Sequence, residues 1–188
     1  MHSLAALTPL GSPLPKTEKI GTLKISEITD CALASVSLRR GKDNGFAVAA
    51  ETLFATALPT PGAWRQAGVY GLIWMGPDQW FVEAPFDSHE DIAKILKAGL
   101  GDSASVTEQT DGWARFDVQG ARVFDLLERL CPAPSRRMQS GSATRTLLEH
   151  IGCLLICRET AQHFTLLAPR SYAKSLLHAL TVAARSIG

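Results

Sequence analysis

The sequence predicts an α+β fold made of two ferredoxin-like (split βαβ) modules packed as one unit. Apolar residues alternate with a period of two or recur at helical spacing in the order β-α-β-β-α-β up to residue 110, and a second round of strands and helices follows. With 188 residues, 46% of them hydrophobic and 20% charged, the chain has the composition of a globular protein with a normal core. We therefore divide it into a flexible N-terminal tail over residues 1–25, a first module over 26–110 and a second module over 111–188.

The predicted tail is rich in proline and in charged residues. Pro9, Pro13 and Pro15 fix local φ angles and prevent regular pairing, while several lysines and Glu18 keep the stretch solvated. Such a segment is expected to be disordered alone, or to become ordered against a partner. The N-terminus has no positive charge ahead of its apolar residues, unlike a signal peptide, and no window approaches the roughly 20 apolar residues of a membrane span.

The first module opens with a strand and a helix. Residues 32–39 alternate with the period of two that is typical of a half-buried strand. A helix capped by Asp43 or Asn44 follows, and Pro59 and Pro61 stop it. The apolar positions of this helix form one continuous face: Phe46, Ala49, Ala50, Leu53, Phe54 and Ala57.

A hairpin, a second helix and a strand complete the first module. Two short apolar runs, 70–75 and 80–84, are joined by the turn residues Gly-Pro-Asp-Gln at 76–79. Ser88 and Asp91 have the spacing of a capping box, which predicts a helix over the apolar positions that follow them. A weak, polar strand is expected over 103–110.

The second module repeats this alternation. We predict a strand over 113–118 and a helix after Gly120, which Pro132 stops, followed by a basic loop over 132–143. The inward positions of that helix are Val123, Phe124, Leu127 and Leu130. Three strands are expected over 144–148, 152–158 and 163–168. A final helix from Ser171 has four inward residues at four-residue spacing: Tyr172, Leu176, Leu180 and Ala184.

Charge and motifs exclude several classes of function. Lys and Arg number 19 and Asp and Glu 18, a formal net charge of +1, so the chain lacks the basic field that binds nucleic acid or anionic membranes. The patterns G-x-G-x-x-G, H-E-x-x-H and G-x-S-x-G do not occur, nor does a phosphate-binding loop. Rossmann-type flavin and nicotinamide enzymes need such glycines to bring the backbone close to a pyrophosphate. We therefore expect no catalytic residue and no cofactor-binding residue in this chain.

His150, Cys153 and Cys157, with His163 nearby, are the best metal candidates. On a strand, the two cysteines would lie about 13 Å apart, which is too far for one zinc ion. We therefore predict no metal site. At this low density, the four cysteines are expected to be reduced thiols of a cytoplasmic protein.

Two further chemical possibilities have little support. A cysteine-dependent enzyme would need a thiolate, but Cys131 precedes a proline at a helix C-terminus, where the helix dipole disfavours a negative charge. Asp111 and Asp117 flank a strand six residues apart, and we interpret both as solvent-facing carboxylates.

Two pairs of residues predict a partner interface. Trp64 and Arg65 lie together in an expected loop over 59–69, and tryptophan and arginine are the residue types most enriched at interface hot spots. Arg136 and Arg137 lie in the irregular basic stretch, where acidic groups of a partner or a polyglutamyl tail could pair with them.

A series of short segments resembles the gamma subunits of heterotetrameric sarcosine oxidase. The likeness runs from about Ile28 to the C-terminus, and the order of the segments is more specific than any one of them. They are Gly76-Pro77-Asp78-Gln79-Trp80, Gln109-Thr110-Asp111-Gly112, Gly120-Ala121-Arg122, Leu130-Cys131-Pro132, Thr144-Arg145-Thr146-Leu147 and Arg170-Ser171-Tyr172-Ala173-Lys174-Ser175-Leu176. The family is similar in fold to the folate-binding part of the glycine cleavage T protein, through the strand and helix from Trp113 to Leu130.

The resemblance implies a non-catalytic subunit, with a structural or assembly role, beside alpha, beta and delta subunits. Such an enzyme oxidatively demethylates sarcosine to glycine, forms hydrogen peroxide, and releases the methyl carbon as formaldehyde or passes it to tetrahydrofolate. FAD, FMN, NAD and tetrahydrofolate are then bound by the larger subunits and none by this chain. After Leu130, where the T-protein pattern has an acidic pair, this sequence has Arg136, Arg137 and Arg145, so no folate site is expected. The alternative is a free-standing folate-binding or aminomethyl-transfer-related protein.

Overall fold

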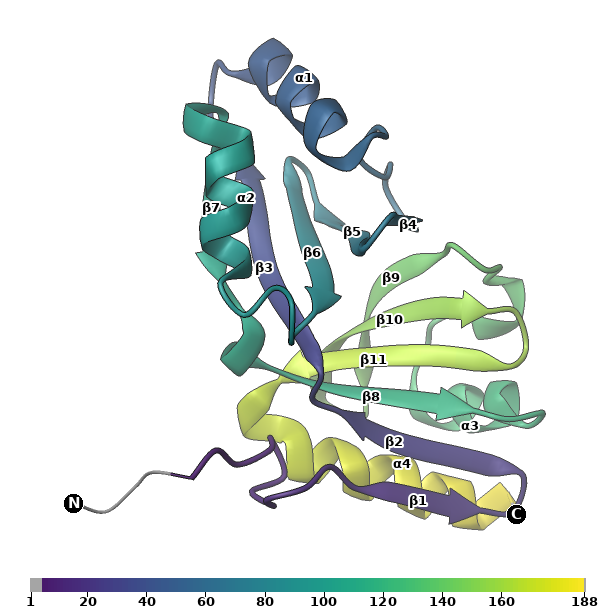
Figure 1. Cartoon of the computed structure of the whole chain (residues 1–188). Coiled ribbons are helices and arrows are strands. Elements are labelled where there is room, and N and C mark those ends of the chain that lie inside the picture. The colour runs from purple at the N-terminus through teal and green to yellow at the C-terminus, as the bar shows by residue number, and fades with distance from the viewer. Residues whose placement is uncertain (1–4, 188) are drawn as a thin grey trace. The chain divides into compact units, whose positions relative to one another are not determined.

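The computed structural model describes residues 5–187, which form two compact units (Figure 1). Unit 1 combines the N-terminal stretch up to Thr29 with the chain from Asp111 onward, and unit 2 is Asp30–Thr110. Each unit contains an antiparallel sheet with two helices packed on one face, so the predicted α+β fold of two ferredoxin-like modules is confirmed. The break between residues 110 and 111 coincides with the predicted module boundary.

Unit 2 is a five-stranded sheet with the strand order β4-β5-β6-β3-β7. Its elements are, in chain order, β3 Cys31–Leu38, α1 Asp43–Phe54, β4 Trp64–Ala67, β5 Tyr70–Gly76, β6 Gln79–Pro85, α2 Ile92–Leu100 and β7 Ala104–Glu108. β3 and β5 run parallel on either side of β6, and β6 and β7 run parallel on either side of β3. The two crossovers therefore interlock as the split βαβ arrangement requires.

Helices α1 and α2 cover one face of this sheet. Phe46, Ala50 and Phe54 of α1 are buried against alternate residues of the strands, as the helical spacing predicted. The predicted capping box at the start of α2 is wrong, because α2 begins at Ile92 and its N-cap residue makes no side-chain cap. Ser88 lies in the preceding turn, and its hydroxyl donates instead to the carbonyl oxygen of Pro85 at 3.4 Å.

Unit 1 is a six-stranded sheet with the order β1-β2-β8-β11-β10-β9. Its elements are, in chain order, β1 Thr17–Ile20, β2 Leu23–Ile28, β8 Trp113–Gln119, α3 Val123–Leu130, β9 Ala143–Leu148, β10 Ile151–Glu159, β11 His163–Pro169 and α4 Ala173–Ile187. The module that starts at β8 closes with α4, and within residues 5–187 no strand follows α4 to complete it. β2 takes that place from the N-terminal side by pairing with β8, so the second split βαβ module is circularly permuted (Figure 1).

The prediction of a flexible tail over residues 1–25 is therefore wrong from Thr17 onward. β1 and β2 form a hairpin, and Leu23 and Ile25 are only 3% and 1% exposed in the helix-covered core. The three prolines that suggested disorder all precede this hairpin. Residues 1–4 of the predicted tail lie outside the described residues.

Gly120 lets the end of β8 lie close to the β1–β2 turn. Its φ is +132°, in the region that favours glycine, and a Cβ atom at this position would collide with the carbonyl oxygen of Thr22. The glycine that was expected to introduce α3 therefore also makes room for the N-terminal hairpin.

Helices α3 and α4 cover one face of the unit 1 sheet. Leu176, Leu180 and Ala184 of α4 are buried in this core, as predicted. Tyr172 is not: it lies in the 3-10 turn Arg170–Tyr172 ahead of α4 and is 48% exposed, so its predicted inward position is wrong. Four-residue spacing does not hold there, because the 3-10 turn has about three residues per turn and shifts the side chain off the buried stripe.

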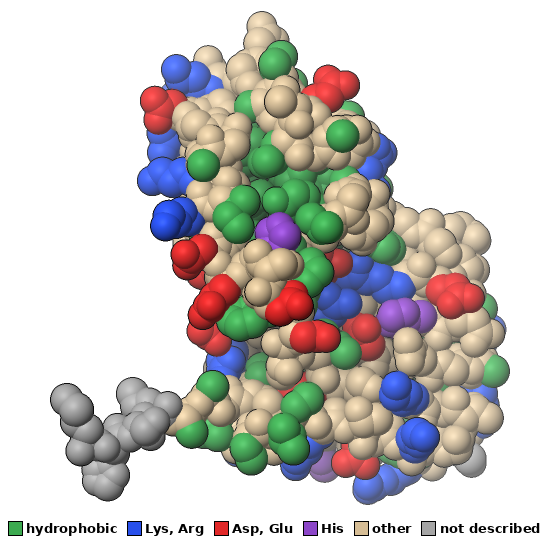
Figure 2. Space-filling view, viewed as in Figure 1, with side chains coloured by type: hydrophobic (Ala, Val, Ile, Leu, Met, Phe, Trp, Pro, Cys, Tyr) green, Lys and Arg blue, Asp and Glu red, His purple; other side chains and the backbone are tan. Residues whose placement is uncertain are grey.

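Within residues 5–187, no helix is long and apolar enough to cross a membrane. Figure 2 shows Lys and Arg interspersed with Asp and Glu over the visible face, in keeping with the formal net charge of +1.

Candidate partner interface

Trp64 and Arg65 lie on β4, the outermost strand on one side of the unit 2 sheet. The loop expected over 59–69 thus contains a strand, which pairs with β5 through Trp64 and Ile73. Trp64 is half-buried, whereas Arg65 is exposed and donates to Thr56 Oγ1 at 3.0 Å. A partner that contacts Arg65 would therefore meet a side chain that is already partly oriented by its own unit.

Arg136 and Arg137 lie in unit 1, in the 3-10 turn Ser135–Arg137 that follows α3. The Arg136 guanidinium bonds Glu128 at 2.6 Å and Asp125 at 2.9 Å, and it lies 5.5 Å from the centroid of the Phe124 ring. The acidic partners that the sequence suggested from another chain are thus supplied by α3 itself. Arg137 is exposed. The two predicted pairs belong to different units, so the structure does not assign them to one site.

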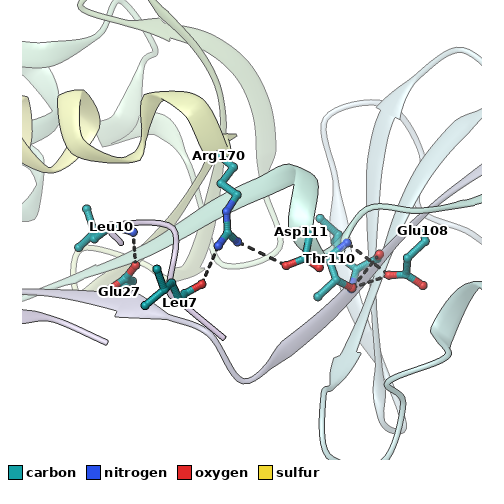
Figure 3. Close-up of polar contacts among 8 residues, drawn as sticks. Leu7, Leu10, Glu27, Glu108, Thr110, Asp111 and Arg170 are labelled. Carbon is teal, nitrogen blue, oxygen red and sulfur yellow. Dashed lines mark hydrogen bonds and ion pairs between the residues drawn. The ribbon is translucent and has the colours of Figure 1, made fainter. Parts of the chain in front are cut away.

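The segment that precedes β1 is attached to unit 1 through a buried carboxylate. Glu27, 4% exposed, accepts hydrogen bonds from the backbone N–H of Leu10 at 3.0 Å and of Lys16 at 3.1 Å. Arg170 donates to the carbonyl oxygen of Leu7 at 2.6 Å and forms an ion pair with Asp111 (Figure 3). This segment, which was expected to be disordered alone or to become ordered on a partner, is therefore held by side chains of its own chain.

Asp117 is the centre of a polar cluster that the sequence did not reveal. It was interpreted as solvent-facing, but it is buried on β8 and accepts a hydrogen bond from Thr165 of β11 at 2.7 Å. Arg115 Nε lies 3.3 Å from Asp117 Oδ1, and His163 Nε2 lies 3.0 Å from Asp117 Oδ2. The His163 contact is close but does not have the geometry of a hydrogen bond. Asp111, by contrast, is exposed as expected.

These contacts keep Asp117 ionised. Burial by itself raises the pKa of this carboxyl, but the His163 ring, the Arg115 guanidinium and the Thr165 hydroxyl together hold that pKa well below its usual range. A group that stays charged throughout the physiological pH range is a poor general acid or base near neutrality. The cluster is therefore suited to stabilising the sheet, and not to proton transfer.

The buried thiols are held in their neutral form. Burial raises the pKa of the Cys131 thiol, and it raises the pKa of the Cys153 thiol to about 11. All four cysteines are reduced, and Cys31 is the most exposed of them. Among residues 5–187, no group of three or more His, Cys, Asp or Glu side chains could hold a metal ion.

We expect Cys31 to be alkylated at least about tenfold faster than Cys153 in the folded chain, because only a small fraction of a thiol with so high a pKa is thiolate at pH 8. Iodoacetamide labelling at pH 8 followed by peptide mass spectrometry measures both rates. All four thiols should react readily in denaturant. Equal rates at Cys31 and Cys153 in the folded chain would contradict the burial described above.

Comparisons with known proteins agree on the fold. No family model matches the chain, and no curated protein does. A chain of the heterotetrameric sarcosine oxidase from Corynebacterium sp. U-96, solved in complex with pyrrole 2-carboxylate, has a TM-score of 0.75 and 20% sequence identity. This match covers 87% of the present chain and 84% of that chain.

A second solved structure is more distant. The glycine cleavage system aminomethyltransferase T from Bartonella henselae has a TM-score of 0.62 and 14% identity, over 85% of this chain and 48% of that chain. The present chain thus spans about half the length of that protein. The predicted T-protein-like fold is confirmed.

Proposed function

We propose that this chain is the gamma subunit of a heterotetrameric sarcosine oxidase, with a structural or assembly role and no cofactor of its own. The observation that supports this most is the likeness to a chain of such an enzyme at a TM-score of 0.75. Because the match covers similar shares of both chains, 87% and 84%, it relates this chain to one of about equal length and not to one domain of a larger subunit.

In this proposal the chemistry takes place in the partner subunits. The alpha, beta and delta subunits, in the cytoplasm, supply FAD, FMN, NAD and tetrahydrofolate, and sarcosine is demethylated there. The shifted pKa values of Asp117 and Cys153 support a structural role, since they keep a buried carboxylate charged and a buried thiol neutral. Trp64, Arg65, Arg136 and Arg137 are the residues that we propose to contact the larger subunits.

Alone, the chain should be colourless and should produce no peroxide from sarcosine. Co-expressed with the alpha, beta and delta subunits of the same organism, it should elute with them as one active complex. Arg65→Ala and Trp64→Ala should each weaken its association about tenfold, the effect of losing one hot-spot side chain. Titration of the purified chain against the other subunits by size exclusion or light scattering measures this.

Arg40→Ala is the matched control, because Arg40 is another exposed arginine of unit 2. It should associate as the wild type does. Melting curves of the isolated variants are needed as well, because Trp64 is half-buried and its loss must not unfold unit 2. Failure of the wild-type chain to join the complex would refute the proposed function.

The alternative is a folate-binding or aminomethyl-transfer-related protein, and the likeness to the aminomethyltransferase favours it as the second candidate. Titration with tetrahydrofolate, followed by tryptophan fluorescence, separates the two. The gamma-subunit proposal expects no saturable quenching, and stoichiometric quenching would replace it with the alternative.

A further inference from the structure

A groove in unit 1 runs along α4, and nothing in the proposed function uses it. Its volume is about 820 Å³, and it lies between α4, the end of α3 and the turn that joins β9 to β10. Helix α4 lines it from Lys174 to Ser186, a length of about 18 Å at 1.5 Å per residue. Most of the lining side chains are exposed, so it is an open surface channel and not an enclosed cavity.

α4 has two stripes of side chains. One is buried in the core, and the other faces the groove with Ser175, Ala179, Val182 and Ser186, spaced at i, i+4, i+7 and i+11. Small residues at three of these positions leave room for another backbone to approach closely. Val182 is 50% exposed, and Tyr172, which also lines the groove, is 48% exposed, so apolar surface is open to water along this channel.

The charged side chains of the groove are mostly basic. Arg129 stands at the end of α3 and Lys174 at the start of α4, against one carboxylate, Glu149 of the turn that joins β9 to β10. Within residues 5–187, the side chains of Arg129 and Lys174 make no hydrogen bond or ion pair. This differs from Arg136, in the turn that follows α3, which is paired with Asp125 and Glu128.

The rim of the groove is held in place. The backbone N–H of Glu149 donates to the carbonyl oxygen of Leu130 at 3.0 Å, which ties the β9–β10 turn to the end of α3. Leu130 and Ile151, which lie beneath, are buried. A partner therefore meets a preformed channel and need not order it on binding.

We infer that this groove binds an acidic amphipathic helix of another protein. The helix places apolar side chains, spaced i, i+3, i+4 and i+7, against Val182 and Tyr172, and its carboxylates face Arg129 and Lys174. A small molecule fits the observations less well, because small-ligand sites enclose most of the ligand surface and this channel is open along its length. The inference does not depend on the proposed function, because it is tested without the oxidase subunits.

The probe is a fluorescein-labelled synthetic helix of 18 residues in which leucines occupy the i, i+3, i+4 and i+7 positions and glutamates the others. A second peptide has lysine in place of every glutamate. Anisotropy titrations with the full chain should show saturable binding of the glutamate peptide, and binding of the lysine peptide at least about tenfold weaker, because its charges oppose those of Arg129 and Lys174.

Variants locate the binding site. The double variant R129E/K174E should bind the glutamate peptide about tenfold more weakly, whereas R185E, a single charge reversal on α4 outside the groove, should bind within about twofold of the wild type. Ser175→Trp should block the channel without a change of charge, which keeps the test valid if the double variant does not fold.

Three results would overturn the inference. The first is equal affinity for the two peptides, and the second is that R185E weakens binding as much as R129E/K174E does. The third is that dodecanoate displaces the glutamate peptide with an affinity similar to that of the peptide, which would make the groove a small-molecule site. Each can occur whether or not the chain joins the oxidase complex, so the failure of one proposal is distinguishable from the failure of the other.

Discussion

Deletion of residues 1–25 is expected to unfold unit 1. The deletion removes β1 and the first half of β2, and with them the buried side chains of Leu10, Leu23 and Ile25. Loss of a buried leucine or isoleucine costs about 2–5 kcal/mol, so three such losses approach the whole free energy of unfolding of a small domain, about 5–15 kcal/mol. β8 also loses part of its neighbouring strand, because Val118 of β8 pairs with Ile25 of β2.

Circular dichroism melting and hydrogen exchange measure this effect. The truncated chain should lose protection in α3 and α4, while the amides of β3 and β6 in unit 2 are the internal comparison. Ile25→Ala is the point variant, with an expected loss of about 2–4 kcal/mol. Leu14→Ala is its control, because Leu14 is 73% exposed and should change stability by less than about 0.5 kcal/mol. A truncated chain that melts as the wild type does would show that the hairpin is dispensable.

Asp117→Asn is expected to destabilise the chain by about 2–4 kcal/mol at pH 7, because it removes the buried charge that pairs with Arg115 and lies beside His163 inside the sheet. The effect depends on pH in a defined direction. The folded-state pKa of Asp117 is lowered, so its stabilisation is fully present above the ordinary aspartate pKa of about 4 and is lost as the pH falls below it. The difference between wild type and variant should therefore be large at pH 7 and shrink below pH 4.

Urea unfolding of both proteins between pH 3 and pH 8 measures this difference. Asp111→Asn is the matched control, because the Asp111 carboxylate is exposed in its ion pair with Arg170. It should change stability by less than about 1 kcal/mol at any pH. If the free energy of unfolding of Asp117→Asn differed from that of the wild type by the same amount at pH 3 and pH 7, the lost interaction would be packing and not the charge of Asp117.

The predictions about partner binding at Trp64, Arg65 and the α4 groove have a different basis from the two stability predictions above. Trp64 and Arg65 were selected by residue type, and the structure adds that they lie on an outermost strand. The α4 groove has its lining on three separate elements, and Tyr172, whose spacing had assigned it an inward position, is part of that lining. The sequence alone did not indicate this surface.

The sequence by itself determined most of the local structure and the fold class. Strand alternation over 32–39 and the helical spacing of Phe46, Ala50 and Phe54 depend on neighbours within a few residues, so a pattern in one sequence is enough to show them. The boundary after residue 110 followed from the same patterns.

Only the tertiary structure decided which strands and charges meet. Ile25 pairs with Val118 across more than ninety positions of the chain, and no local pattern records that a strand before the first module completes the second. Asp117 is buried and charged because β11 brings Thr165 and His163 beside it. Burial and ion pairing are properties of contacts between distant segments, and for that reason the hairpin and the Asp117 cluster were missed while the helices and strands around them were found.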